Sequence, residues 1–133
     1  MMEKTVLQPK ILHKPFSTYS HGIAVDGAKR IVFLAGQVAG TADGTLAGEG
    51  DFDAQGEQVM KNLRDVLAEA GAAFSDVVKL TTYVVRQEDT QRARDLVGKH
   101  FHEVSPPPAN TLCVLQGLAT TKFLIEIEAI AVL

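Results

Sequence analysis

Apolar residues recur at helical spacing in two stretches of the chain, residues 52–70 and 88–105. Gly71 ends the first stretch, while the second begins with an N-cap at residues 88–90 and ends in a Ser-Pro-Pro-Pro sequence. The pattern predicts two amphipathic helices. Their apolar positions are Val59, Leu63, Val66, Leu67 and Ala70 in the first and Ala93, Leu96, Val97, Phe101 and Val104 in the second.

Three other stretches have the branched side chains and turn boundaries that are typical of strands. They cover residues 77–85, 106–115 and 123–133, and a short edge strand is expected at residues 5–7. In the stretch 77–85 apolar and polar residues alternate, which indicates a strand with one buried face.

A hairpin is expected where residues 23–25 and 30–36 flank Asp26-Gly27, since this pair supplies the positive φ of a tight turn. Gly36, at the end of an apolar strand, indicates close backbone approach. The glycine-rich stretch 40–50 lacks the Gly-Lys-Ser/Thr ending of a phosphate loop and is interpreted as plain loop.

The last predicted strand is apolar on both faces, although Glu126 and Glu128 share one of them. Such a strand is covered on both faces. Two helices of a small chain can cover only one, so a second copy of the chain is expected on the other. The element order predicts an α+β fold, a mixed sheet with two helices packed on one face.

Composition narrows the function classes. The 133 residues are expected to form one domain, residues 1–133, with 46% hydrophobic and 22% charged residues. The net charge of −3 gives no general electrostatic reason to bind nucleic acid. The start of the chain lacks an apolar signal region and no apolar run has membrane length, so a cytoplasmic protein without membrane contact is expected. The single cysteine, Cys113, makes a disulfide or a structural zinc site a poor interpretation.

Five sequence features together resemble the RidA/YjgF reactive-intermediate deaminase family. They are Tyr19 before the strand at Gly22, Leu-Ala-Gly-Gln-Val at 34–38, the helix with Asn62-Leu63 that ends in Glu-Ala-Gly at 69–71, Val-Val-Lys-Leu-Thr-Thr-Tyr-Val at 77–84, and Leu-Ile-Glu-Ile-Glu-Ala-Ile-Ala at 124–131. The resemblance implies a chorismate-mutase-like fold and a homotrimer whose sheets form a central barrel with three clefts between subunits. It also implies hydrolysis of enamines or imines, such as 2-aminoacrylate, to a 2-keto acid and ammonia without metal or organic cofactor.

The resemblance also implies site residues. Glu126 matches the glutamate that positions the attacking water, and Tyr19 and the backbone near Gly36 match the pocket. Asn110 stands where family members have an arginine that holds the substrate carboxylate, and Leu112 stands where they have cysteine. Together these five residues are expected to line one cleft at the subunit boundary.

Ala35 and one basic residue complete the candidate site. Ala35 stands where family members often have serine, and Arg94, Lys14 or His21 could replace the missing arginine by reaching in from another element. The uncharged Asn110 favours a substrate different from the 2-imino acids of the family.

Alternative interpretations remain for the same residues. Tyr19 could be a wall residue rather than a proton donor, Asn110 could satisfy backbone groups, and Glu128 is expected to be a structural partner. His100 and His102 lie two apart on a helix and cannot share a face as ligands. The alternative function is a non-catalytic trimeric protein that binds a small metabolite, and the acidic balance gives less support to a ribonuclease or translation inhibitor.

Overall fold

The computed structural model describes all 133 residues and contains six strands and two α-helices. In chain order they are β1 (Glu3–Val6), β2 (Ile23–Asp26), β3 (Ile31–Gln37), α1 (Phe52–Glu69), β4 (Val77–Val84), α2 (Thr90–Phe101), β5 (Ala109–Val114) and β6 (Ile125–Val132). Short 3-10 turns, Phe74–Asp76 and Gln87–Asp89, precede β4 and α2. Both predicted helices are confirmed, although α2 ends before Val104.

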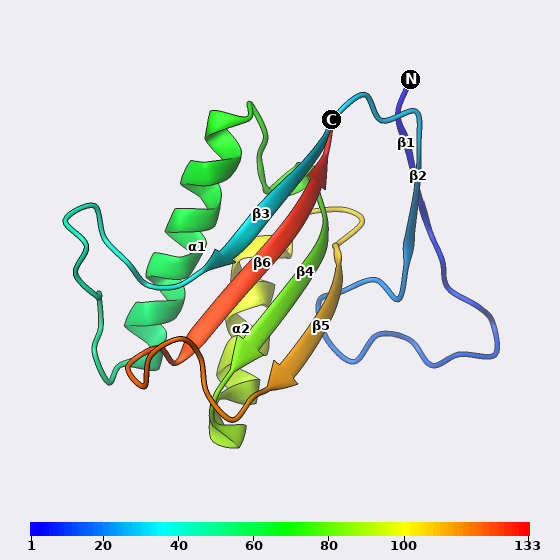
Figure 1. The fold of residues 1–133 in the computed structure, drawn as a ribbon. Coiled ribbons are helices and arrows are strands. Elements are labelled where there is room, and N and C mark those ends of the chain that lie inside the picture. Colours follow the sequence, from blue (N-terminus) through cyan, green and yellow to red (C-terminus); the bar gives the residue numbers. More distant parts are fainter.

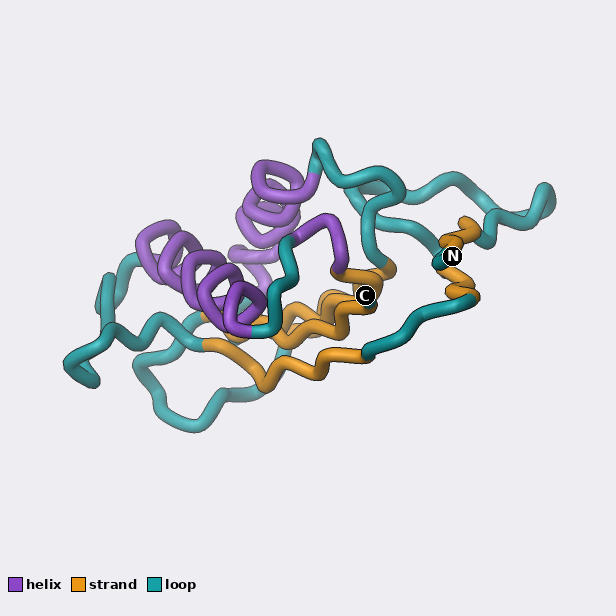
Figure 2. Tube along the Cα trace, turned by 90° about the horizontal axis from the view of Figure 1, so that it is seen from above, coloured by secondary structure: helices purple, strands orange, loops and turns teal.

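The main sheet has the strand order β3-β6-β4-β5, with β6 antiparallel to both of its neighbours and β4 parallel to β5. Both helices pack on one face of this sheet, and the opposite face carries no helix (Figures 1 and 2). The predicted α+β fold, a mixed sheet with two helices on one face, is therefore confirmed. No helix has the length and apolar character needed to cross a membrane.

The hairpin predicted for residues 23–36 is wrong. Gly27 does adopt a positive φ of 75°, but β2 pairs with β1 and β3 pairs with β6. The turn at Gly27 therefore connects two different sheets, and the β1–β2 ribbon stands beside the main sheet in Figure 1. The cause is long-range pairing, because β6 offers β3 a longer partner than the four residues of β2.

The hydrophobic core lies between the sheet and the helices. One parity of β6 points into it and is almost completely buried: Ile125, Ile127, Ala129 and Ala131. Leu80 and Val84 of β4 belong to the same buried cluster, together with Leu63 and Leu67 of α1. Burial of each large aliphatic side chain contributes about 1.5–3 kcal/mol, so this face of the sheet carries most of the fold's apolar stabilisation.

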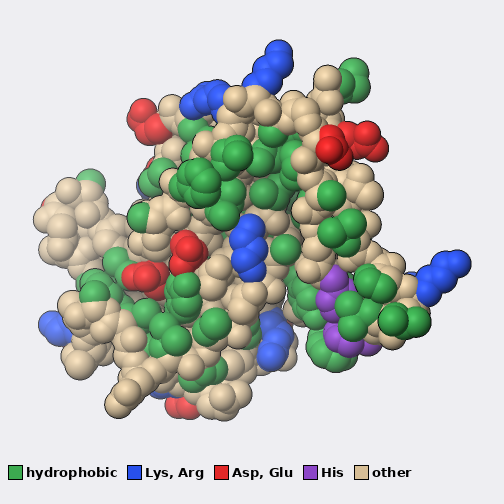
Figure 3. Space-filling model, turned by 45° about the vertical axis from the view of Figure 1, so that its right-hand side comes forward, with side chains coloured by type: hydrophobic (Ala, Val, Ile, Leu, Met, Phe, Trp, Pro, Cys, Tyr) green, Lys and Arg blue, Asp and Glu red, His purple; other side chains and the backbone are tan.

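The opposite face of the sheet, which we call the open face, remains accessible in the protomer. Ile31 and Phe33 of β3 are 60% and 74% exposed. On the second parity of β6, Glu126, Glu128 and Ile130 are half-buried, whereas Val132 is buried. Figure 3 shows hydrophobic side chains gathered in patches with acidic and basic side chains among them. A protomer with large exposed apolar residues on a sheet face is typical of a protein that associates.

Candidate functional site

A cavity of about 480 Å³ lies beside β5, on the helix-bearing side of the sheet. We call it the β5 cavity. Its walls come from the loop before β2, the first half of α2, and strands β4 and β5. The lining residues are Phe16, Ser17, Thr18, Tyr19, Thr82, Gln91, Ala93, Arg94, Val97, Asn110 and Leu112. Its volume falls within the range of small-molecule clefts, roughly 300–1,000 Å³.

Ser20 fixes the loop wall of this cavity against the sheet. Its backbone N–H donates to the Pro108 carbonyl at 3.1 Å, and its hydroxyl donates to the Pro107 carbonyl at 2.6 Å. Ser20 also forms a single parallel β-bridge with Ala109 on the outer edge of β5, and it is only 4% exposed. Tyr19, the preceding residue, is thereby held at the cavity.

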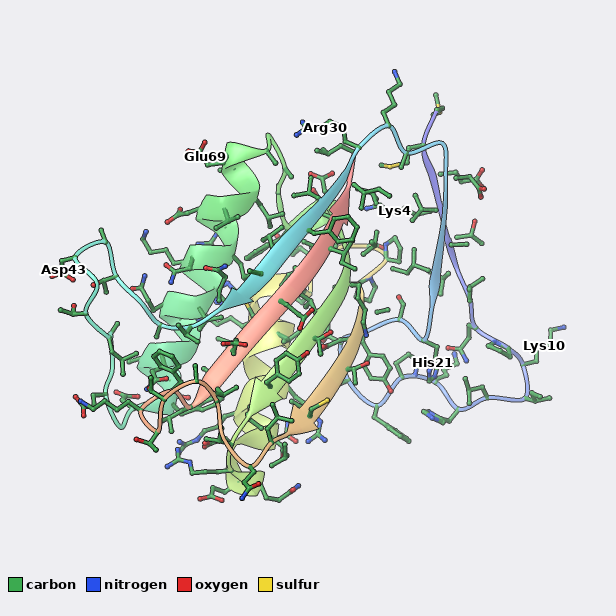
Figure 4. All side chains as sticks on the ribbon, viewed as in Figure 1. Lys4, Lys10, His21, Arg30, Asp43 and Glu69 are labelled. Atoms are coloured by element: carbon green, nitrogen blue, oxygen red, sulfur yellow. The ribbon has the colours of Figure 1, made fainter.

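Phe16 and Tyr19 are the aromatic residues of the loop wall, and two histidines pack against them. His13 stacks on Phe16 with ring centroids 4.1 Å apart, and His21 meets His13 edge-on at 4.8 Å. The Tyr19 hydroxyl accepts a hydrogen bond from the Phe16 backbone N–H at 3.2 Å. His21, labelled in Figure 4, donates from Nε2 to the His13 carbonyl at 2.7 Å. The histidines thus organise the loop, and neither lines the cavity.

Asn110 and Leu112 form the part of the cavity wall that comes from β5. β5 runs parallel to β4 with Asn110 opposite Leu80 and Leu112 opposite Thr82, so these residues share the helix-bearing face. The Thr82 hydroxyl donates to Asn110 Oδ1 at 3.1 Å, which fixes the orientation of the side-chain amide. Arg94 of α2 lines the same cavity.

Glu126 and Gly36 lie together on the open face. A Cβ built on Gly36 would be 2.6 Å from Glu126 Oε2, so only glycine leaves room for this carboxylate. The register of β3 and β6 shifts between Leu34 and Gln37, and this irregularity contains Gly36 and the exposed Ala35. We call Ala35, Gly36 and Glu126 the Glu126 group.

Glu128, two residues along β6, has a different partner. It accepts a hydrogen bond from the Tyr83 hydroxyl at 2.5 Å, and this bond raises the pKa of Tyr83 above its ordinary value. On the same face Lys79 donates to the Thr111 hydroxyl at 2.8 Å. These pairs occupy the polar side chains around Glu126, whereas its own carboxylate makes no side-chain hydrogen bond in the protomer.

The expected site residues therefore form two groups within one protomer. Tyr19, Asn110, Leu112 and Arg94 line the β5 cavity, whereas Ala35, Gly36 and Glu126 lie on the other face of the sheet. A single chain does not bring all of them into one cleft.

Sequence reasoning missed Phe16, Thr82 and Gln91 as cavity residues. The alternation in β4 predicts the face on which Thr82 lies, but the sequence does not show that β4 pairs with β5. His100, expected to have a packing or solvated role, bonds Glu57 at 2.9 Å between the two helices. No group of three or more His, Cys, Asp or Glu side chains is arranged to hold a metal ion.

The fold and the site define a class of protein: a small α+β domain with a ligand-sized cavity at one sheet edge and a carboxylate on a helix-free sheet face. The chain belongs to the RidA/YjgF family, because the family model described as Endoribonuclease L-PSP matches residues 11–133. The family resemblance drawn from the sequence motifs is thereby confirmed.

Individual relatives match over nearly the whole chain. A RutC family protein of Synechocystis is 32% identical and a RutC family protein of Pyrococcus abyssi is also 32% identical, with at least 98% of each chain covered. Among solved structures, the Rid family protein YyfB of Yersinia pestis, described as of unknown function, has a TM-score of 0.88 at 38% identity over 98% of both chains. Yeast Mmf1 has a TM-score of 0.72 at 25% identity, also over 98% of both chains.

Proposed function

We propose that this protein hydrolyses an enamine or imine intermediate, releasing ammonia, in a cleft formed between copies of the chain. The observation that carries the proposal is the Glu126 carboxylate on the open face, seated against Gly36 with no protein hydrogen-bond donor of its own. A carboxylate in that position is free to bind and orient water. The resemblance of the sequence motifs to the RidA/YjgF family implies the same reaction class.

The chemistry requires one general base and one proton source. Glu126 accepts a proton from water as the water oxygen bonds to the carbon of the C=N group, and the nitrogen gains a proton. As the C–N bond of the resulting carbinolamine breaks, its hydroxyl group gives up its proton and the nitrogen takes one, so the nitrogen leaves as ammonia and the carbon becomes a carbonyl. An enamine enters the same sequence after a proton is added to its β-carbon, which converts it to the imine. The Tyr19 hydroxyl, which accepts the Phe16 N–H, keeps its own proton available for donation to the ligand.

The two groups of site residues meet only if two protomers contribute. The sheet ends in two edge strands, β3 and β5, and its open face exposes Ile31 and Phe33. A closed ring of copies covers that face and reduces the exposure of the two edge strands. In the homotrimer that we propose, the open faces form a central barrel, and the Glu126 group of one copy lies beside the β5 cavity of its neighbour.

The test combines assembly and turnover. Light scattering at micromolar concentration is expected to give three times the monomer mass, and a stable monomer would contradict the shared cleft. Imines are generated in situ from a panel of amino acids by an amino-acid oxidase, and keto-acid release is followed. Glu126→Gln is expected to lower the rate by about a hundredfold or more with the assembly intact, because the amide cannot accept a proton from water.

The matched control is Glu128→Gln, on the same strand and the same face two residues away. Its carboxylate is bound to Tyr83, so the variant is expected to keep most of the activity. An unchanged rate in Glu126→Gln would show that this residue has a structural role. Binding of keto acids without turnover of any imine would favour the non-catalytic alternative.

A further inference from the structure

Arg94 is the one charged side chain among the eleven residues that line the β5 cavity. The other polar lining residues carry hydroxyl or amide groups, and no acidic side chain is among them. The cavity therefore has a single formal positive charge and no internal counter-charge.

Two acidic residues of the α2 region, Asp89 and Asp95, bind other partners. Asp89 accepts from Arg86 Nε at 2.7 Å and lies 4.0 Å from an Arg92 nitrogen, and Asp95 accepts from Gln91 at 2.9 Å. Arg94 forms no ion pair and no hydrogen bond in the protomer. A guanidinium group has five N–H donors and no acceptor, so it offers a fork that fits a carboxylate.

Two neutral donors in the same cavity are also available. Asn110 uses its Oδ1 to accept from Thr82, which leaves both N–H groups of its amide free to donate. The Tyr19 hydroxyl accepts from the Phe16 backbone and retains its proton. Three donor groups that have no protein acceptor, from α2, β5 and the loop, thus line one cavity, and Arg94 among them is exposed to solvent. Acceptor oxygens of a ligand would replace the water around these groups.

Apolar side chains form part of the remaining wall, and the space is large. Leu112, Val97, Ala93 and the exposed Phe16 contribute apolar surface. The cavity volume of about 480 Å³ lies within the roughly 300–1,000 Å³ of clefts that hold drug-sized ligands. A two- or three-carbon acid would fill little of it.

We propose that Arg94 is the carboxylate-binding residue of the β5 cavity, and that the preferred ligands are carboxylates with a sizeable apolar side chain. Asn110 and Tyr19 donate to the same carboxylate, and the apolar walls contact the side chain. The role of such a ligand as substrate rests on the proposed hydrolysis, whereas its binding does not. Of the other two basic candidates, Lys14 and His21, neither lines the cavity.

The test uses unreactive ligands and the full chain. Isothermal titration calorimetry compares 3-phenylpropionate with its neutral amide, 3-phenylpropionamide, and with the smaller propionate. The wild-type protein is expected to bind 3-phenylpropionate most tightly. In Arg94→Gln the affinity for 3-phenylpropionate is expected to fall by about ten- to a hundredfold, because a charge-assisted fork is lost, while the affinity for the amide changes little. Arg94→Lys keeps the charge but lacks the forked guanidinium group, so its affinity for 3-phenylpropionate is expected to lie between those of the wild type and Arg94→Gln.

Arg92→Gln is the matched control, since Arg92 lies two residues away on α2 and outside the β5 cavity. It is expected to leave the binding of all three ligands unchanged. Equal affinity of the wild-type protein for 3-phenylpropionate and its amide, or unchanged carboxylate binding in Arg94→Gln, would overturn the inference.

The outcomes separate the two proposals. Turnover that depends on Glu126, together with carboxylate binding that does not depend on Arg94, overturns the assignment of Arg94 alone. Carboxylate binding that depends on Arg94 supports this assignment even if no imine is hydrolysed, and in that case only the proposed reaction fails.

Discussion

Replacement of Gly36 by alanine would test whether the position of Glu126 determines activity. The added Cβ would lie 2.6 Å from Glu126 Oε2, 2.7 Å from Cδ and 2.9 Å from Cγ. Ordinary van der Waals contacts of a Cβ begin at 3.4 Å, so the carboxylate must withdraw by 0.8 Å or more. The clash is with the end of a flexible side chain, which can move without displacing the backbone.

The change is expected to separate activity from stability. Displacing a catalytic group by about 1 Å costs on the order of a hundredfold in rate. The backbone of Gly36 does not have a positive φ, so alanine adds no backbone strain there, and the reduced entropy of the unfolded chain contributes up to about 1 kcal/mol of stability. Gly36→Ala is therefore expected to be as stable as the wild-type protein and about a hundredfold slower.

The assay is keto-acid release from imines generated in situ, with urea unfolding measured in parallel. Gly40→Ala is the matched control, because a Cβ at Gly40 has no neighbour within 4 Å and Gly40 has no positive φ. Its rate is expected to match the wild type. Full activity in Gly36→Ala would refute the reasoning, since it would mean that the position of the Glu126 carboxylate against Gly36 has no part in the reaction.

Three further changes probe the core, the helix pair and the cavity. Gln55→Leu is expected to lower the free energy of unfolding by about 2–4 kcal/mol in urea titrations, because the buried amide donates to the Gly48 and Lys122 carbonyls and accepts from the Leu124 N–H. A hydrogen bond from Lys99 lowers the pKa of Glu57 below its ordinary value of 4.5. Because the Glu57 side chain is 44% exposed, the ion pair is expected to add less than about 1 kcal/mol to the free energy of unfolding. This stabilisation is expected to be present above pH 4.5 and lost as the pH falls below it. Asn110→Arg is expected to raise the rate with small 2-imino acids by about tenfold, measured as keto-acid release, by adding a bidentate donor to the cavity.

Each of these changes has a control. Gln58→Leu removes a single hydrogen bond, to Asn62, and a loss as large as that of Gln55→Leu would contradict the first reasoning. Glu57→Gln is expected to remove the part of the stability loss below pH 4.5 that Glu57 causes, and an unchanged profile would contradict the second. Thr111→Arg adds the same charge on the open face, and an equal gain in rate there would show that charge, not placement, matters.

Local patterns were sufficient to predict most elements. The helical spacing of Val59, Leu63 and Leu67 predicts α1, and these residues are indeed buried. Alternation predicts β4, with Leu80, Thr82 and Val84 on its buried face. Strict alternation would place Val77 on the opposite face, but the register shift between Val77 and Lys79 leaves Val77 buried as well. A bulge inserts one residue without any change in composition, so the pattern of residue types does not reveal it.

Spatial neighbours could not be predicted in the same way. The Asp26-Gly27 turn was identified correctly as a site of positive φ, but its two flanking strands chose other partners. Likewise, the sequence shows which residues of β5 share a face with Asn110. It does not show whether Asn110 and Glu126 lie on the same face of the sheet, because that depends on β4 lying between β5 and β6. Strand order is a property of the whole sheet, and one-dimensional periodicity carries little information about it.

Residues 8–21 make hydrogen bonds to the rest of the protein only through Ser20. This attachment leaves the preceding segment free to accept substitutions, insertions or deletions without breaking any ladder of the sheet. Ligand preference can therefore diverge between homologues through this one segment while the scaffold stays constant. A library randomised at positions 13–18 with Tyr19 and Ser20 retained would explore new specificities at little cost in folding.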